Sequence, residues 1–279
     1  MNTLKHRAIR YFWDPEPRNE DPSAMIWCLG RQYTEIPPAS NDISLESAVK
    51  DDPASTWPPE FLDDFESRIW MTYRTDFPPI PRSLESKALS LSNPAAALEY
   101  AGRVLKGQTG DGFTSDAGWG CMIRSAQSLL ANALITLHLG RGIISRYFVD
   151  VEWRKNKAEL ATEHVKILSW FADNPDAPFS IHKFVRHGEV SCAKSPGEWF
   201  GPSAASRCIQ LVSQDFEPAN LHVSVTGDVD GVYKDQVERL SAPGPMKPTL
   251  LLIAKRLGHD NVNPQYYRSL KVFPLPSAS

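Results

Sequence analysis

The stretch DAGWGCMIRSAQSLL, from Asp116 to Leu130, places a cysteine at the point where the chain changes character. The residues before Cys121 are small and turn-forming, whereas the residues after it follow a helical pattern. Apolar side chains recur there at three- and four-residue steps: Met122, Ala126, Leu129, Leu130, Ala133 and Leu137. This spacing predicts a helix that begins at Cys121 and that Gly140 can end.

The whole chain has the composition of a soluble globular protein. Its 279 residues are 42% hydrophobic and 23% charged, enough for one large domain or two small ones. The formal net charge of -3 argues against nucleic acid as a main partner. No apolar run is long enough to cross a bilayer, and Met1–Trp13 lacks the apolar centre of a signal peptide. We therefore expect a cytoplasmic protein.

The four cysteines follow no pattern typical of a disulfide scaffold or a structural zinc site. They lie at positions 28, 121, 192 and 208, and no two of them are closely spaced. We expect neither a bound metal nor a cofactor.

The remaining segments predict a mixed α+β domain with a pair of strands late in the chain. The first 21 residues form a polar tail, and residues 36–60, rich in Pro, Ser, Asp and Glu, read as a mobile loop. We expect helices at 61–77, 94–105, 158–173, 180–187, 202–214, 233–241 and from 263 onward, and strands at 24–33, 221–227 and 248–257.

Cys121 is a candidate nucleophile because of where it lies. The thiolate is the reactive form of cysteine, and the N-terminus of a helix offers it unpaired N–H groups and the positive end of the dipole. Gly118 and Gly120 would let a substrate approach closely, and Trp119 between them could form a wall of a cleft. The alternative is that Cys121 is a small apolar residue buried at the start of a helix.

Five segments of the chain resemble, in order, those of the autophagins, the cytosolic cysteine proteases that process the ubiquitin-like autophagy modifier. TSDAGWGCMIRSAQ is similar to their active-site segment, and ESRIWMTYRTDFPPI to their pre-catalytic helix. The others are IWCLGRQY, SPGEWFGPSAA and PTLLLIAKRLG. The resemblance implies a papain-like fold over residues 22–271 and an enzyme that cleaves after the modifier's C-terminal glycine and also releases the modifier from phosphatidylethanolamine.

The resemblance also implies a role for several residues. Cys121 would be the nucleophile, and Tyr73 would support the oxyanion hole. Trp199 would line the groove that receives the substrate's glycine, with Trp119 and Gly120 as further substrate-binding residues. From the residues alone, a half-buried helix aromatic is the favoured interpretation of Tyr73, and packing against Phe200 is an equal alternative for Trp199.

The histidine and aspartate of the autophagin site have no match here. In that family they come from an Asp-Pro-His segment, which this sequence lacks, and residues 272–279 resemble nothing in the family. His259, next to Asp260, is the best of the seven histidines, but neighbouring residues on an extended chain point in opposite directions. We therefore expect a C-terminally truncated, papain-like domain without the strands that carry the pair. Such a chain would be catalytically inactive, and would serve as a modifier-binding fragment or misfold.

The expected partner is the ubiquitin-like modifier, free or lipid-conjugated. Tyr33–Ile36 has the aromatic-x-x-aliphatic form that can dock on such a modifier by strand addition. Contact with a membrane surface would be transient and would come through the lipidated substrate, at autophagosome assembly sites.

Overall fold

The computed structural model describes residues 19–33 (apart from 22), 57–82, 112–140, 157–226, 233–239, 244 and 247–268. The chain divides into two compact units, and each is described by itself. Residues 1–68, 142–149 and 257–279 form the first, and residues 69–141 and 150–256 form the second. The expected helix at 94–105, most of the expected mobile loop and the tail at 272–279 lie outside the described residues.

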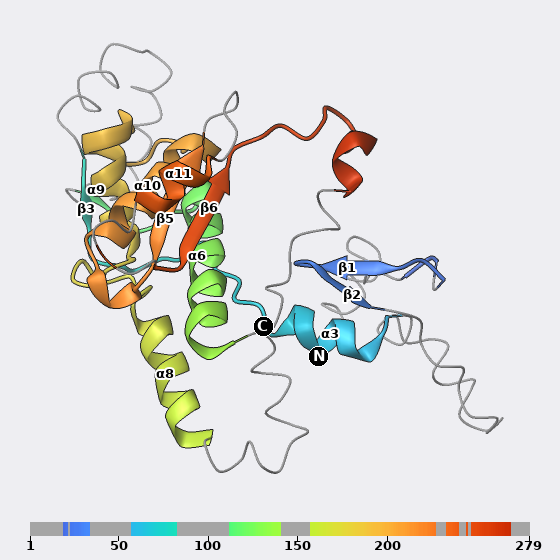
Figure 1. Cartoon of the computed structure of the whole chain (residues 1–279). Coiled ribbons are helices and arrows are strands. Elements are labelled where there is room, and N and C mark those ends of the chain that lie inside the picture. Colours follow the sequence, from blue (N-terminus) through green and yellow to red (C-terminus); the bar gives the residue numbers. More distant parts are fainter. Residues whose placement is uncertain are drawn as a thin grey trace, which may run out of the picture. The chain divides into compact units, whose positions relative to one another are not determined.

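The first unit contains a hairpin and one helix (Figure 1). Strands β1 (Ile26–Cys28) and β2 (Arg31–Tyr33) pair antiparallel through a two-residue turn, Leu29–Gly30, in which both residues have positive φ. Helix α3 (Pro59–Glu66) contacts β1 and begins inside the segment expected to be a loop. The first unit also holds the short 3-10 helix η4 (Pro264–Tyr266).

The second unit is built around helix α6 (Cys121–Leu139), which the sequence predicted from its first residue to its end at Gly140. Its apolar face differs from the expected one. The residues buried on it include Ile123, Ala126, Leu130 and Leu134, whereas Leu129 is 45% exposed. Two polar residues, Arg124 and Gln127, are buried on the same helix, and this shifts the buried face away from the apolar pattern.

Helix α10 lies at the centre of the packing around α6. It spans Pro202–Gln214, as predicted, and contacts α6, α9 (Ile181–Cys192) and strand β5 (His222–Thr226). Strand β6 (Thr249–Ile253) pairs parallel with β5 in register His222 to Thr249, and in Figure 1 the two arrows lie beside α10. This pair is the late strand pair predicted from the sequence.

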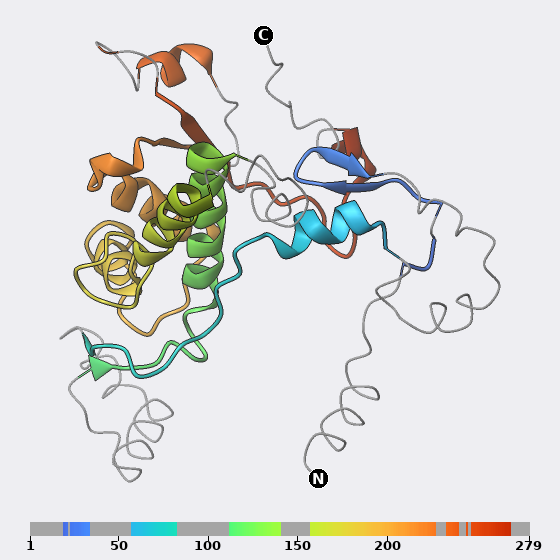
Figure 2. The same cartoon turned by 90° about the horizontal axis from the view of Figure 1, so that it is seen from below.

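The remaining elements of the second unit are short or lie beside these. Helix α8 (Lys157–Ser169) packs on α6, and η3 (Glu217–Ala219) contacts α10. Strands β3 (Ile80–Pro81) and β4 (Gly112–Phe113) pair antiparallel, and α11 (Lys234–Arg239) lies between β5 and β6 in the sequence. Figure 2 shows α6 with β3 and β4 from a second direction.

The helix expected at 61–77 is wrong beyond its first turns. Helix α3 stops at Glu66, and Tyr73 lies on extended chain. The reason is that side chains of α6 bind the backbone that a helix would have paired internally. Asn132 Oδ1 accepts from Ile69 N at 3.0 Å and Asn132 Nδ2 donates to Ile69 O at 2.9 Å, while Ser128 Oγ accepts from Met71 N at 2.9 Å.

The helix expected from residue 263 lies largely outside the described residues. Only the 3-10 turn η4 and the residues that follow it to Arg268 are described. Among the described helices, none combines the length and the apolar character needed to span a membrane.

Candidate active site

The turn before α6 presents Cys121 at the surface. The carbonyl oxygen of Asp116 accepts hydrogen bonds from the N–H groups of Trp119 at 3.1 Å and Gly120 at 2.8 Å, which closes the turn. Gly118 has φ of 88°, a conformation that favours glycine. The thiol of Cys121 is exposed, so the buried alternative for this residue does not hold.

Gly120 is required by a close approach. A Cβ built on it would lie 2.4 Å from Asp116 Oδ2 and 2.6 Å from Asp116 Cβ. The chain can therefore pass over the Asp116 carboxylate only with glycine at this position. The sequence predicts a role for Gly120 in substrate approach, and the structure adds this packing requirement.

Tyr73 lies beside the thiol. Its side chain is 49% exposed, and its pKa is raised above the ordinary value of 10.0, first by a hydrogen bond with the Cys121 side chain and then by desolvation and by the charges of Cys121 and Asp116. The phenol therefore stays protonated at neutral pH and can donate a hydrogen bond. The structure brings together the two residues that the resemblance had paired, although not on a helix.

Trp199 also reaches the cysteine turn. Its indole Nε1 donates to the carbonyl oxygen of Gly118 at 2.5 Å, and its side chain is 70% exposed. The alternative of packing against Phe200 does not hold, because Phe200 is the buried member of the two and its ring occupies the space above Gly188. Trp199 is far from Cys121 in sequence, but it presents an open aromatic surface at Gly118, three residues before the cysteine.

Trp119 lies differently from the cleft wall that was expected. It is 6% exposed, its indole Nε1 donates to Ser115 O at 3.0 Å, and its ring lies 5.5 Å from that of Phe113. Phe113 in turn fills the space beside Gly197, where a Cβ would come within 2.4 Å of its ring. Trp119 therefore supports the turn from beneath and offers little surface to a ligand.

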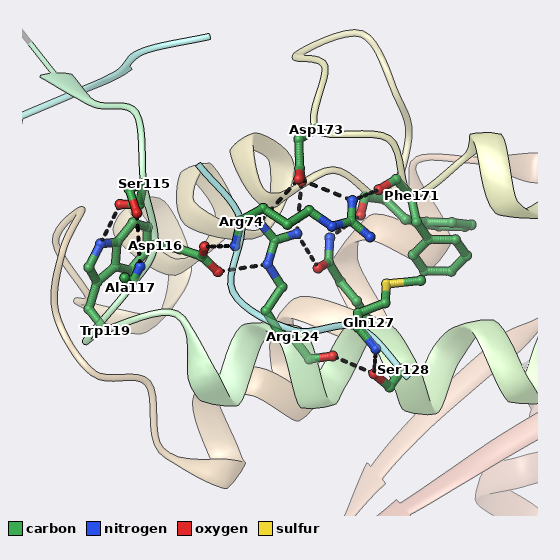
Figure 3. A network of polar contacts seen from close by, with 12 residues as sticks. Arg74, Ser115, Asp116, Ala117, Trp119, Arg124, Gln127, Ser128, Phe171 and Asp173 are labelled. Carbon is green, nitrogen blue, oxygen red and sulfur yellow. Dashed lines mark hydrogen bonds and ion pairs between the residues drawn. The ribbon is translucent and has the colours of Figure 1, made fainter. Parts of the chain in front are cut away.

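A buried network of charges lies under the turn, and the sequence analysis missed it (Figure 3). Arg124 is 2% exposed, and its guanidinium lies between two carboxylates. Its Nε donates to Asp116 Oδ2 at 2.7 Å, and its Nη1 and Nη2 donate to the two oxygens of Asp173 at 2.8 and 3.2 Å. Arg74 Nη1 donates to Asp173 Oδ2 at 3.1 Å, so two arginines balance two aspartates.

Burial and pairing act in opposite directions on Arg124. Burial lowers the pKa of its guanidinium, but hydrogen bonds and charges from Asp173 and Asp116 outweigh that effect and raise the pKa above its ordinary value. Gln127 completes the arrangement, since its Oε1 accepts from Arg124 Nη1 at 3.0 Å and its Nε2 donates to Phe179 O at 2.8 Å. Every donor group facing the interior here has an acceptor, as a buried ion needs.

Three described histidines have a partner other than Cys121. Nε2 of His138 lies 3.0 Å from Ala219 O, that of His182 2.7 Å from Pro78 O, and that of His187 2.9 Å from Asp215 Oδ2. Burial lowers the pKa of His164, which disfavours its charged form.

The last two described histidines lie in different units. His222 lies on β5, as the sequence indicated. His259 is exposed and belongs to the first unit, whereas Cys121 belongs to the second. His6 lies outside the described residues.

The docking motif expected at Tyr33–Ile36 is described only at its first residue. Tyr33 is 3% exposed, its ring packs edge-on against Phe61 at 5.7 Å, and its hydroxyl donates to the buried carboxylate of Asp64. Asp64 also accepts from Arg68. The aromatic side chain on which docking would depend is therefore inside the first unit.

Comparison with known proteins identifies a family. The model of the peptidase C54 catalytic domain matches residues 58–277. Curated relatives include a probable cysteine protease atg4 of Penicillium rubens, 48% identical over 274 residues, and one of Aspergillus oryzae, 46% identical over 297 residues. A third, from Sclerotinia sclerotiorum, is 45% identical over 307 residues.

These relatives are longer than the chain described here. The alignments cover 95%, 100% and 95% of this chain, but 64%, 69% and 66% of the Penicillium, Aspergillus and Sclerotinia proteins. The chain thus spans about two thirds of the length of the curated relatives that it matches.

Proposed function

Because the chain belongs to the peptidase C54 family, the autophagins, we propose that it is the nucleophile-bearing part of a thiol peptidase that acts on a ubiquitin-like modifier. The bond cleaved would follow the modifier's C-terminal glycine. The observation that carries this proposal is the meeting of three side chains from distant parts of the sequence at one exposed helix start: Cys121, Tyr73 and Trp199.

Each of these side chains has a step in the proposed reaction. The sulfur of Cys121, as thiolate, attacks the glycyl carbonyl carbon, and the Tyr73 hydroxyl donates to the oxygen on which negative charge develops. The carbon–nitrogen bond then breaks, and the departing amine takes up the proton that the thiol gave to a base. Water hydrolyses the thioester, which frees the modifier's glycine carboxylate and the thiol.

Trp199 gives the proposed site its preference for glycine. Its flat ring stands beside the turn that carries Cys121 and is held there by the bond to Gly118 O. A residue without a side chain can pass an aromatic wall that a larger residue would meet. The same chemistry would release the modifier from phosphatidylethanolamine, because that amide also follows the terminal glycine.

We propose that the chain as given binds the modifier without turning it over. The sequence holds no Asp-Pro-His segment, and Nε2 of His138, His182 and His187 has a partner other than Cys121. Strands β5 and β6 pair with no third strand among the described residues. Leu251 and Ile253, on one face of β6, are 40% and 56% exposed, so this face of the strand is open.

The proposed partner is the modifier, and a membrane would be met only through its lipid. Docking on Tyr33–Ile36 would require the Tyr33 ring to leave its contacts with Phe61 and Asp64, which disfavours that motif. We propose a cytoplasmic enzyme that meets lipidated modifier where autophagosomes form. A fluorescent fusion should be recruited to such sites only in cells that lipidate the modifier.

Incubation with unprocessed modifier tests the proposed function. We expect this chain to bind the modifier and to leave its C-terminal extension in place, whereas Trp199→Ala weakens the binding. Fast cleavage that Cys121→Ala abolishes would show that a base exists in this chain and would contradict the inactive state. A chain that neither binds nor cleaves the modifier would contradict the proposed function as a whole.

A further inference from the structure

Asp116 connects three segments of the second unit. Its carboxylate is fully buried, with Oδ1 accepting from Arg74 N and Oδ2 from Arg124 Nε, both at 2.7 Å. Its own N–H donates to Arg74 O at 3.3 Å, and its carbonyl oxygen accepts from Gly120 N. One residue therefore joins the chain that carries Tyr73, the turn before Cys121, and helix α6.

The Tyr73 segment is fastened at two ends. At the far end, Ile69 is held by Asn132 of α6 through the two bonds given above. At the near end, Arg74 is held by Asp116, and Tyr73 is its neighbour in sequence. The near end decides where the phenol hydroxyl lies relative to the thiol, because Arg74 directly follows Tyr73 along the chain.

Arg124 in turn fixes the orientation of Asp116. It lies one helical turn from Cys121 on α6, and its guanidinium is clamped on the opposite side by Asp173. Both oxygens of the Asp116 carboxylate face a donor, so the group has no freedom to rotate without losing a bond. An amide in its place offers one acceptor oxygen to two donors.

We propose that Asp116 is a positioning residue for the peptidase reaction: its carboxylate sets the spacing between the Tyr73 hydroxyl and the Cys121 sulfur, and Arg124 and Asp173 hold that carboxylate in place (Figure 3). Asp116 does not touch the substrate. The inference rests on the proposed function for its catalytic meaning, but the positioning acts on the thiol itself and is measured without any turnover.

Alkylation of the folded full chain by iodoacetamide, followed by peptide mass spectrometry, reads the effect at Cys121. Loss of the hydrogen bond between the phenol and the thiol in Tyr73→Phe should change the alkylation rate of Cys121 roughly three- to tenfold. Cys208, which is 0% exposed, serves as an internal reporter, because it reacts only when the second unit opens.

The proposal predicts non-additive effects in double variants. In Asp116→Asn, adding Tyr73→Phe should change the rate at Cys121 less than twofold, because the contact is already lost. In Asn132→Ala, which releases the far end of the same segment, Tyr73→Phe should keep its full effect. If Asp116 only stabilised the fold, Tyr73→Phe would keep its full effect on the alkylation rate in Asp116→Asn as well, and that result would overturn the proposal.

Asp173 provides a second test with a matched control. Alkylation of Cys208 would show whether Asp116→Asn opens the fold. In that case Asp173→Asn is the deciding variant, because it weakens the binding of Arg124 from a side chain that is 12% exposed. It should reduce the Tyr73→Phe effect at least twofold, whereas Asp176→Asn, exposed in the same turn, should not. An unreduced effect in Asp173→Asn overturns the proposal.

A separate assay keeps the two proposals apart. Binding and cleavage of the modifier report on the proposed function, and the alkylation cycle reports on Asp116. A chain that never acts on the modifier but shows the coupling would remove the peptidase assignment and leave the positioning role.

Discussion

The start of α6 and the edge of β6 differ in how completely they are built. At the first, Cys121 and Tyr73 are exposed, but the turn beneath them rests on buried and fully paired charges. At the second, β6 pairs with β5 alone in the described chain and leaves Leu251 and Ile253 in the open. Within the described residues, the charges beneath the thiol are therefore buried and paired, whereas one face of β6 is open.

This difference shows that the two halves of the proposed site have separate supports. The geometry around the thiol depends on contacts among α6, the Tyr73 segment and the Asp173 turn, none of which involves β6. Supplying a base should therefore change turnover without altering the thiol, and disturbing the charge network should change the thiol without altering the sheet.

Completing the sheet should have the largest effect. We expect the chain joined to the C-terminal segment of the Aspergillus oryzae relative, which is longer, to cleave unprocessed modifier at least about a hundredfold faster than the chain alone, because general acid–base catalysis typically contributes that much or more. Cleavage of a modifier–reporter fusion measures it. The control is the same fusion with the histidine of the added segment replaced by alanine. Equal cleavage rates in the two fusions would contradict the view that the added segment supplies the base.

Removing the arginine at the centre of the network should be the most damaging single change. Arg124→Met leaves the carboxylates of Asp116 and Asp173 without their main partner, and we expect a loss of about 3–5 kcal/mol in the free energy of unfolding. Urea denaturation followed by tryptophan fluorescence measures it. Arg186→Met, on the exposed face of α9, should stay within about 0.5 kcal/mol. Similar losses in both would mean that the buried pairs do not support the turn.

Two glycines that precede helices offer a matched comparison. Gly120 and Gly201 are both N-caps with negative φ, but a Cβ on Gly120 would collide with Asp116 whereas one on Gly201 meets nothing within 4 Å. Gly120→Ala should lower the free energy of unfolding by about 1–3 kcal/mol, and Gly201→Ala should have little effect. Thermal unfolding of the two variants tests this. Equally small losses of stability in both would show that the turn can move away from Asp116.

The smallest expected effect is a shift in a titration. Since a hydrogen bond with Cys121 and, less strongly, the charge of Asp116 raise the pKa of Tyr73, Cys121→Ala should lower that pKa more than Asp116→Asn does. Tyrosinate absorbance, with Tyr73→Phe as the reference, measures it. The stability that Tyr73 contributes should be complete below its ordinary value of 10.0 and be lost as the pH rises through the raised value. Unchanged titration in Cys121→Ala would mean that the two groups are not in contact.

The sequence predicted the elements that depend on neighbouring residues. Helix α10 begins at Pro202 as expected, and α6 begins at Cys121, because local turn and helix signals mark both starts. The prediction of a helix through Tyr73 was wrong, because the backbone of that segment is bound by Ser128 and Asn132, more than fifty residues away. Nothing in the pattern around residues 61–77 indicates those partners.

The charge network could not be predicted for a related reason. Arg124 lies in a helical stretch where a solvent-exposed arginine is the usual expectation, and Asp173 lies forty-nine residues further along. Only folding brings their charges together. By contrast, Cys121 and Trp199 could be singled out, because their short motifs resemble those of a known family and need no partner to be recognised.

The reactivity of the four thiols in the folded chain directly tests whether Cys121 is an accessible nucleophile. We expect iodoacetamide to modify the exposed Cys121 first. Cys208 is fully buried and burial raises its pKa, so it should stay unmodified until the chain unfolds. Peptide mass spectrometry over a time course gives the order. If Cys121 remained as unreactive as Cys208 under native conditions, the thiol would not be available to a substrate, and the assignment of Cys121 as nucleophile would be contradicted.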